Sequence, residues 1–135
     1  MPITHVWNGH GSAIFLELGK LNYPKEGGKL TNNPDGEYTI MIEWEWRIEC
    51  DYKIMAGSGQ ESKEFMKTLS NLIGKDIIYI EVIGQIPEIK IKFSNGYILK
   101  SFMTYPDEPE WAIIDHTPSS LPTLAVQDGQ LSCES

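Results

Sequence analysis

The stretch Glu37–Glu49, EYTIMIEWEWRIE, decides the fold class that this sequence predicts. Its residues alternate between two chemical types over a dozen positions. Every second residue is apolar: Tyr38, Ile40, Ile42, Trp44, Trp46 and Ile48. The residues between them are mostly polar or charged: Thr39, Met41, Glu43, Glu45, Arg47 and Glu49. Alternation with a period of two is typical of a β-strand with one buried face, so we predict a central strand that buries both tryptophans and exposes the glutamates.

A single helix is predicted after this strand. Ser58 and Glu61 have the spacing of a capping box, in which each side chain bonds to the backbone N–H of the other residue. The apolar residues that follow recur at intervals of three and four, which places them on one stripe of a helix: Phe65, Met66, Leu69, Leu72 and Ile73. We therefore expect one packed α-helix near residues 60–73.

Short apolar segments bounded by turn signals predict the other strands. Asn33-Pro34-Asp35-Gly36 and Ser94-Asn95-Gly96 are the clearest turn signals. The strand-like segments are Ala13 to Leu21, Lys53 to Ala56, Lys75 to Ile83, Ile86 to Phe93, Tyr97 to Thr104 and Glu110 to Asp115. Because the connections after the helix are short, these strands should pair antiparallel. The expected fold class is α+β, mostly antiparallel β, with a curved sheet or partial barrel of about seven strands and one packed helix.

The length of 135 residues indicates one domain spanning residues 1–135. Residues 1–12 are predicted as an opening loop, with room for a short strand at Ile3 to Val6. Residues 116–135 are predicted as a partly flexible tail with a short strand near Leu124 to Val126. Neither a signal-peptide pattern nor a run of about 18 apolar residues is present, so we expect a cytoplasmic protein.

The formal charge of −8 restricts the class of partner. An acidic surface repels nucleic acid and anionic membranes, so we predict neither as a partner, and it attracts basic proteins. Simple solubility explains the same charge equally well. The two cysteines, Cys50 and Cys133, lack metal-ligand spacing. A single disulfide between them stays open, although a reducing compartment favours free thiols.

Motifs for catalysis, metal binding or nucleotide binding are missing from the sequence. His5, His10 and His116 have neither ligand spacing nor a matched nucleophile. Gly57-Ser58-Gly59 precedes a helix, but it lacks the lysine and hydroxyl of a phosphate loop, and helix capping accounts for it. We therefore predict no catalytic residue, no metal and no cofactor.

Two groups of acidic residues are the main candidates for a binding site. On the predicted central strand, Glu43, Glu45 and Glu49 share a face with Arg47. A second group lies in the acidic loop before the last predicted strand: Asp107, Glu108 and Glu110. A solvated surface explains such a face, and so does an acidic surface that binds basic side chains. Paired carboxylates also occur in glycosidases, but that chemistry needs a cleft and a raised pKa.

The order of five segments resembles a group of small bacterial proteins. The segments are GEYTIMIEWEWRIE, AGSG, LIGKDI, PEIKIKFSNGYILKSF and EWAII, and the resemblance covers roughly residues 13–115. Some members of the group look like immunity proteins of polymorphic toxin systems, including contact-dependent growth inhibition. The resemblance implies a non-enzymatic protein that binds and neutralises a toxin, and such toxins are often basic nucleases.

The hypothesis from sequence is an immunity protein that forms a 1:1 complex with the C-terminal domain of a cognate toxin. It would block the active site or the substrate groove of that toxin. The candidate toxin-binding residues are Glu43, Glu45, Arg47, Glu49, Asp107, Glu108 and Glu110. A small enzyme that uses clustered carboxylates or histidines stays an alternative, as does a generic ligand-binding β-barrel. An enzyme needs acids that converge in a concave pocket, whereas an inhibitor needs an exposed acidic patch.

Overall fold

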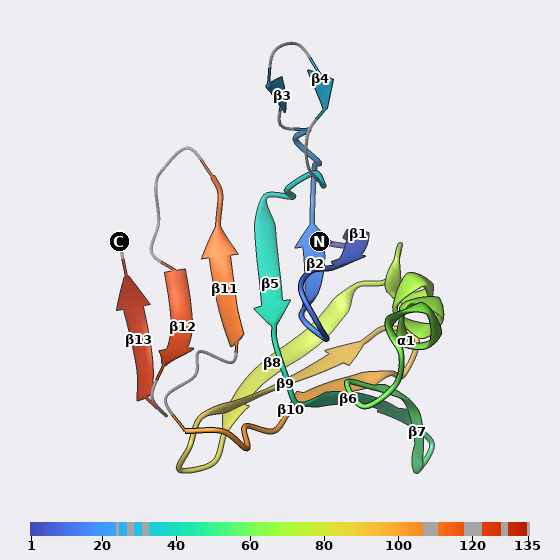
Figure 1. The fold of residues 1–135 in the computed structure, drawn as a ribbon, viewed down its shortest axis with the longest axis vertical. Coiled ribbons are helices and arrows are strands. Elements are labelled where there is room, and N and C mark those ends of the chain that lie inside the picture. The colour runs from blue at the N-terminus through green and yellow to red at the C-terminus, as the bar shows by residue number, and fades with distance from the viewer. Residues whose placement is uncertain are drawn as a thin grey trace.

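Two antiparallel sheets carry most of the chain, and their strands cross one another (Figure 1). The first sheet has six strands in the order β1-β2-β5-β11-β12-β13. These strands are β1 (Ile3–Asn8), β2 (Ile14–Leu18), β5 (Tyr38–Ile42), β11 (Trp111–Asp115), β12 (Thr123–Gln127) and β13 (Gln130–Glu134). The computed structural model describes residues 1–23, 25–26, 29–30, 33–106, 111–117, 123–127 and 130–134, with backbone alone for residues 25–26, 29–30, 123–127 and 130–134.

The second sheet is formed by one continuous part of the chain. Its five strands have the order β7-β6-β10-β9-β8. They are β6 (Trp46–Cys50), β7 (Lys53–Gly57), β8 (Ile77–Ile83), β9 (Glu88–Phe93) and β10 (Ile98–Ser101). A small hairpin of β3 (Lys25–Glu26) and β4 (Lys29–Leu30) stands apart from both sheets (Figure 1). The predicted α+β class with mainly antiparallel strands is confirmed, but the strands form two sheets instead of one curved sheet or partial barrel of about seven strands.

The predicted central strand is in fact two strands that belong to different sheets. The chain leaves the first sheet after Ile42, bends through residues 43–45, and enters the second sheet at Trp46. Ile42 and Trp46 both face the core between the sheets, so the alternation of the sequence continues across the bend. Trp44 lies in the bend and is 39% exposed, so the prediction that both tryptophans are buried is wrong for Trp44. Trp46 is only 3% exposed, as predicted.

The core lies between the two sheets and is closed at one side by the helix. Both sheets contribute fully buried side chains, among them Ile14, Leu16, Ile40, Ile42, Ile48, Ile89, Ile91, Phe93 and Leu99. Trp46 packs its ring edge-on against Phe65 of the helix at 5.0 Å between ring centroids. Full burial of a large apolar side chain stabilises a fold by about 1.5–3 kcal/mol, so the facing sheets are the main source of stability.

The helix lies where the sequence predicts it but begins differently. Helix α1 (Ser62–Leu69) continues as the 3₁₀ helix η1 (Ser70–Leu72), and its apolar stripe buries Phe65, Leu69 and Leu72. The predicted capping box is wrong, because Glu61 at the N-cap makes no side-chain capping bond. The hydroxyl of Ser58 instead accepts a hydrogen bond from the backbone N–H of Trp46, at 3.1 Å.

The chain ends are more regular than predicted. Strand β1 replaces most of the opening loop expected over residues 1–12 and pairs with β2. The tail expected over residues 116–135 contributes the strands β12 and β13 to the first sheet. In the part of the chain that the structure describes, no helix has the length and apolar character required to cross a membrane.

Candidate binding surface at the junction of the two sheets

The bend at residues 43–45 and the end of β10 meet at one side of the second sheet. Ser101 lies opposite Trp46 in the β6–β10 ladder. Immediately beyond it, the N–H of Phe102 donates to the carbonyl of Glu45 at 2.7 Å, and the N–H of Glu45 donates to the carbonyl of Phe102 at 3.3 Å. These two bonds fix Glu45 and Phe102 side by side. We call the surface around them the junction surface, formed by Trp44, Glu45, Arg47, Ile54, Lys100 and Phe102. Trp44 lines a smaller pocket that shares Glu45 with the pocket lined by the other residues.

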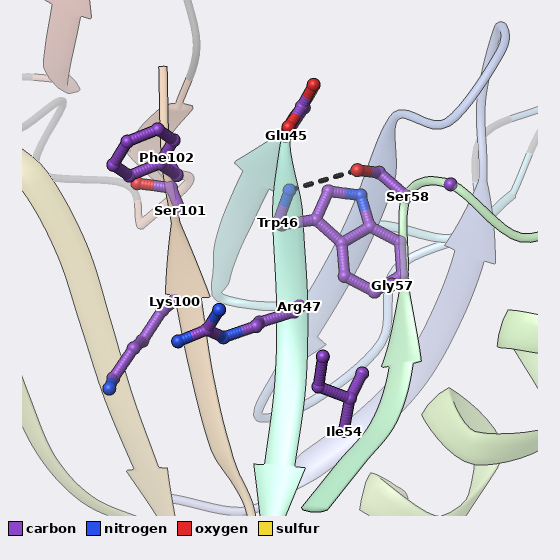
Figure 2. A pocket seen from close by; sticks show the side chains of 10 residues that line it. Glu45, Trp46, Arg47, Ile54, Gly57, Ser58, Lys100, Ser101 and Phe102 are labelled. Atoms are coloured by element: carbon purple, nitrogen blue, oxygen red, sulfur yellow. Dashed lines mark hydrogen bonds between the residues drawn. The ribbon is translucent and has the colours of Figure 1, made fainter. Parts of the chain in front are cut away.

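A shallow pocket of about 400 Å³ lies on the junction surface (Figure 2). Strand β7 is held beside β6 by Ser58, whose N–H donates to the carbonyl of Trp46 at 2.9 Å. Gly57 and Gly59 lie on either side of Ser58 and line the pocket without side chains of their own. Figure 2 shows Arg47 extending from β6 toward Lys100 on β10, with Ile54 below and Glu45 and Phe102 at the upper end.

On the outer face of β6, one glutamate lies between two basic side chains. Glu49 accepts from the Nε of Arg47 at 3.0 Å and pairs with the Nζ of Lys100 at 2.9 Å. The hydrogen bond from Lys100 is the main reason why the pKa of Glu49 lies below its usual value. Burial opposes this effect, and the hydrogen bond from Arg47 adds a smaller lowering of the pKa. Lys90 lies next to Lys100 across the β9–β10 ladder, so this face bears charges of both signs.

The structure brings some of the predicted binding residues together and separates others. Glu45 and Arg47 line the same pocket, and Glu49 binds Arg47 directly. Glu43 and Glu45 lie in the bend, outside the strand that carries Arg47 and Glu49. Three predicted residues lie outside the described part of the chain: Asp107, Glu108 and Glu110.

Exposed apolar side chains at the junction surface were not predicted from sequence. Trp44 is 39% exposed, Phe102 is 66% exposed and Ile54 is 68% exposed. In a one-dimensional pattern each of them resembles a core residue of a strand. Trp44 and Phe102 lie just outside strand ends, where the chain changes direction, and that position is visible only once the sheets are assigned.

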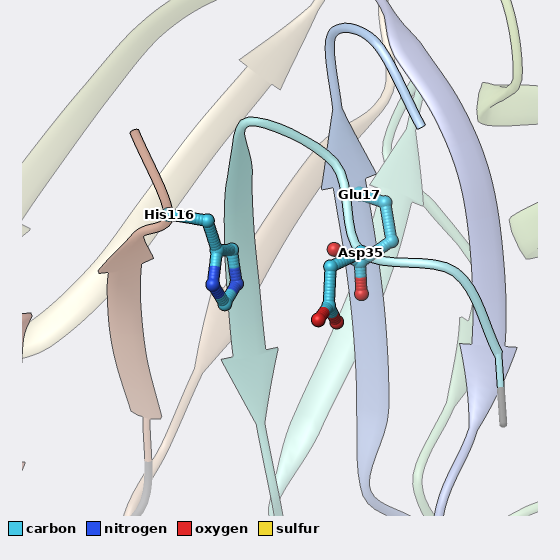
Figure 3. Close-up of side chains that lie close together, drawn as sticks. All are labelled: Glu17, Asp35 and His116. Carbon is cyan, nitrogen blue, oxygen red and sulfur yellow. The ribbon is translucent and has the colours of Figure 1, made fainter. Parts of the chain in front are cut away.

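A second polar cluster lies at the opposite end of the first sheet, around the fully buried Glu17 (Figure 3). Its carboxylate accepts a hydrogen bond from the indole N–H of Trp7 at 2.8 Å and another from the N–H of Gly36 at 3.0 Å. The hydroxyl of Thr39 donates a third. A Cβ on Gly36 would lie 2.3 Å from the carbonyl oxygen of Leu18, so only glycine lets this backbone come close to the carboxylate.

His116 extends this hydrogen-bond network toward the surface. Its Nε2 lies 2.8 Å from the Thr39 hydroxyl. Because that hydroxyl donates its one hydrogen to Glu17, Nε2 of His116 must be the donor. Ligand atoms of Glu17, Asp35 and His116 lie within 4.8 Å of one another, a separation compatible with a metal site. However, three protein donors already bond to Glu17, so the network is explained as a structural link between β2, β5 and the end of β11.

No family model, curated protein or solved structure matches this chain. The junction surface exposes tryptophan, phenylalanine and arginine side chains, which are residue types enriched at protein–protein contact surfaces.

Proposed function

We propose that this chain is a cytoplasmic, non-enzymatic immunity protein that binds the C-terminal domain of a cognate bacterial toxin in a 1:1 complex. The observation that carries the proposal is the junction surface, where Trp44, Ile54 and Phe102 expose large apolar groups around Glu45 and Arg47. The order of sequence segments that resembles immunity-type proteins supports the same function.

The apolar groups of this surface would supply most of the binding energy. Tryptophan, tyrosine and arginine dominate the residues whose truncation weakens protein complexes by 2 kcal/mol or more, typically ~2–4 kcal/mol. Burial of Trp44 and Phe102 by a partner would remove apolar area from water that the isolated chain leaves exposed. Shape and apolar contact at this surface would therefore set the dissociation rate.

The net charge of −8 would act mainly on the approach of the toxin. An acidic protein attracts a basic domain over a distance of about one Debye length, roughly 8 Å at physiological salt. The expected partner is a basic nuclease domain, whose substrate site binds phosphate groups. Glu45 offers an exposed carboxylate at the junction surface that can occupy such a site in place of phosphate.

A binding experiment tests this proposal directly. Where the reading frame immediately upstream of this chain encodes a large secreted protein, the probe is the C-terminal domain of that protein, purified and mixed with this chain. Phe102→Ala and Glu45→Lys should each weaken the complex at least tenfold, which corresponds to about 1.4 kcal/mol. Glu61→Lys, an exposed charge reversal at the start of α1, is the matched control and should leave affinity unchanged.

The kinetic result separates the two contributions. Glu45→Lys should lower the association rate and reduce its dependence on salt, whereas Phe102→Ala should raise the dissociation rate. A triple charge reversal tests whether the second acidic group also contributes to toxin binding; it replaces Asp107, Glu108 and Glu110. If the upstream domain does not bind, the immunity function is rejected. If it binds and both junction variants match Glu61→Lys, the binding surface lies elsewhere on the chain.

A further inference from the structure

Strand β8 forms one edge of the second sheet and has β9 as its only strand partner among the described residues. Its seven residues read IIYIEVI, and five of them are aliphatic. Four side chains of the strand are strongly exposed: Ile78 at 59%, Ile80 at 39%, Val82 at 42% and Ile83 at 42%. Edge strands of soluble proteins are usually shielded by charges, prolines or short length, so an apolar edge of this length requires an explanation.

The exposed residues Ile80 and Val82 belong to the core-facing side of the sheet. Ile80 lies opposite Ile91 and Val82 lies opposite Ile89, and both of these β9 residues are completely buried. The apolar face of the second sheet thus continues onto β8, but the first sheet no longer covers it there. The register is irregular only between Ile77 and Tyr79, so the strand is regular from Tyr79 to its end at Ile83.

The hydrogen-bonding groups of this edge can be assigned from the neighbouring hairpin. The N–H of Phe93 donates to the carbonyl of Tyr97, so Phe93 directs its backbone groups toward β10. In an antiparallel sheet the direction alternates along the strand, so Ile91 also points toward β10 and Lys90 points toward β8. Lys90 lies opposite Glu81, which therefore bonds to β9. The N–H and C=O groups of Ile80 and Val82 consequently point to the unpaired edge.

We propose that a second copy of this chain pairs antiparallel with β8, with the two-fold axis at Ile80. Ile80 then lies opposite Ile80 of the second copy. On the other face, Tyr79 lies opposite Glu81, a phenol donor next to a carboxylate. The two five-stranded sheets become one continuous sheet across the dimer.

Charge and pattern favour this register and a second copy as the occupant. A register centred at Glu81 would also direct the correct backbone groups at each other, but it would place Glu81 opposite Glu81. Like charges in directly opposed positions destabilise a strand pair. Centred at Ile80, the pattern of the strand is self-complementary, as an interface around a two-fold axis requires. The junction surface lies toward the β6–β7 side of the sheet, so dimer formation leaves it open on both copies.

The first test measures the mass of the full chain by light scattering over a range of protein concentrations. The wild type should reach twice the monomer mass. Ile80→Lys should remain monomeric, because it places two ammonium groups opposite each other. Ile54→Lys on the opposite edge strand is the control: Ile54 is more exposed, at 68%, and its replacement should leave the dimer intact. Circular dichroism checks that both variants are folded.

The second test determines the register by cross-linking in a background of Cys50→Ser and Cys133→Ser. Opposed residues of a hydrogen-bonded pair have Cα atoms about 5.5 Å apart, within the roughly 4.4–6.8 Å range of disulfides. Ile80→Cys should therefore form a covalent dimer under mild oxidation much faster than Ile54→Cys. Val82→Cys should not, because its two copies would be four residue steps apart, about 13 Å.

Each alternative outcome overturns the proposal. A monomer at all concentrations rejects the dimer, as does Ile80→Cys cross-linking no faster than Ile54→Cys. Assemblies larger than two reject a closed interface. Faster cross-linking of Glu81→Cys than of Ile80→Cys rejects the register. None of these measurements involves a toxin, so their failure is distinguishable from failure of the immunity function.

Discussion

Replacement of Glu17 tests the structural role assigned to the buried polar cluster. Glu17 is completely buried in β2 and accepts hydrogen bonds from Trp7, Gly36 and Thr39. Glu17→Ala would leave these three donors without their acceptor and would open a cavity. Glu17→Gln keeps the volume but turns an N–H₂ group toward one or more of the donors.

The expected loss of stability follows from the burial of each donor. An unsatisfied buried donor costs about 1–3 kcal/mol. The donors of Gly36 and Thr39 are buried, so each should cost the full amount when it loses its acceptor. Trp7 is partly exposed, so its indole N–H can bond to water instead. We therefore expect Glu17→Ala to lower the free energy of unfolding by about 3–6 kcal/mol and Glu17→Gln by about 2–3 kcal/mol. The larger loss is a substantial part of the roughly 5–15 kcal/mol that stabilises a typical domain.

Urea denaturation followed by tryptophan fluorescence measures these losses. Glu37→Ala is the matched control, because Glu37 also lies at this end of the first sheet and accepts a backbone hydrogen bond, from Lys20, but is exposed. Its loss should stay below about 1 kcal/mol, in line with other exposed positions. If Glu17→Ala and Glu37→Ala destabilise the protein equally, the carboxylate of Glu17 does not hold these strands together, and the cluster requires a different explanation.

Two further predictions concern the second sheet. Trp46→Ala should lower the free energy of unfolding in urea by about 3–5 kcal/mol, because Trp46 packs against Phe65 in the core. Trp44→Ala should lower it by less than about 1 kcal/mol, because Trp44 lies exposed in the bend. Equal losses would contradict the bend. The pKa of Glu49 is lower in the folded state than in the unfolded chain, so folding resists its protonation. The stabilisation from its ion pair with Lys100 is therefore complete above the unfolded glutamate pKa of about 4.3. This stabilisation is lost as the pH falls through the lower pKa of the folded state. The difference in unfolding free energy between wild type and Glu49→Gln should therefore shrink on acidification, and a constant difference from neutral to acidic pH would exclude this linkage.

Local patterns in the sequence predict the elements well but not the sheet to which each belongs. The apolar stripe of the helix locates residues 62–72, and the Ser94-Asn95-Gly96 turn is present, with the N–H of Gly96 bonded to Phe93. The bend at residues 43–45 is invisible to the same reasoning. Since Ile42 and Trp46 both face inward, two strands of facing sheets give the same alternation as one long strand.

The candidate site is predictable only in part for a similar reason. Glu45 and Arg47 are recognisable as charged residues of one segment, and they do line one pocket. The exposure of Phe102 depends on where β10 ends, and the exposure of Ile80 depends on where the first sheet stops covering the second. Both are properties of the assembled sheets. The burial of Glu17 is likewise hidden, because its donors come from residues 10, 19 and 22 positions away.

The paired backbone bonds between Glu45 and Phe102 also bear on the order of folding. Ile42 and Trp111 lie opposite each other in the first sheet, although about 70 residues separate them in the chain. Once β6 and β10 have paired, the effective loop between Ile42 and Trp111 shortens to about a dozen residues, which reduces the entropic cost of closure by roughly 1.5 kcal/mol. We therefore expect the five-stranded sheet to form early. The six-stranded sheet, which contains strands from both ends of the chain, should be the later of the two to assemble.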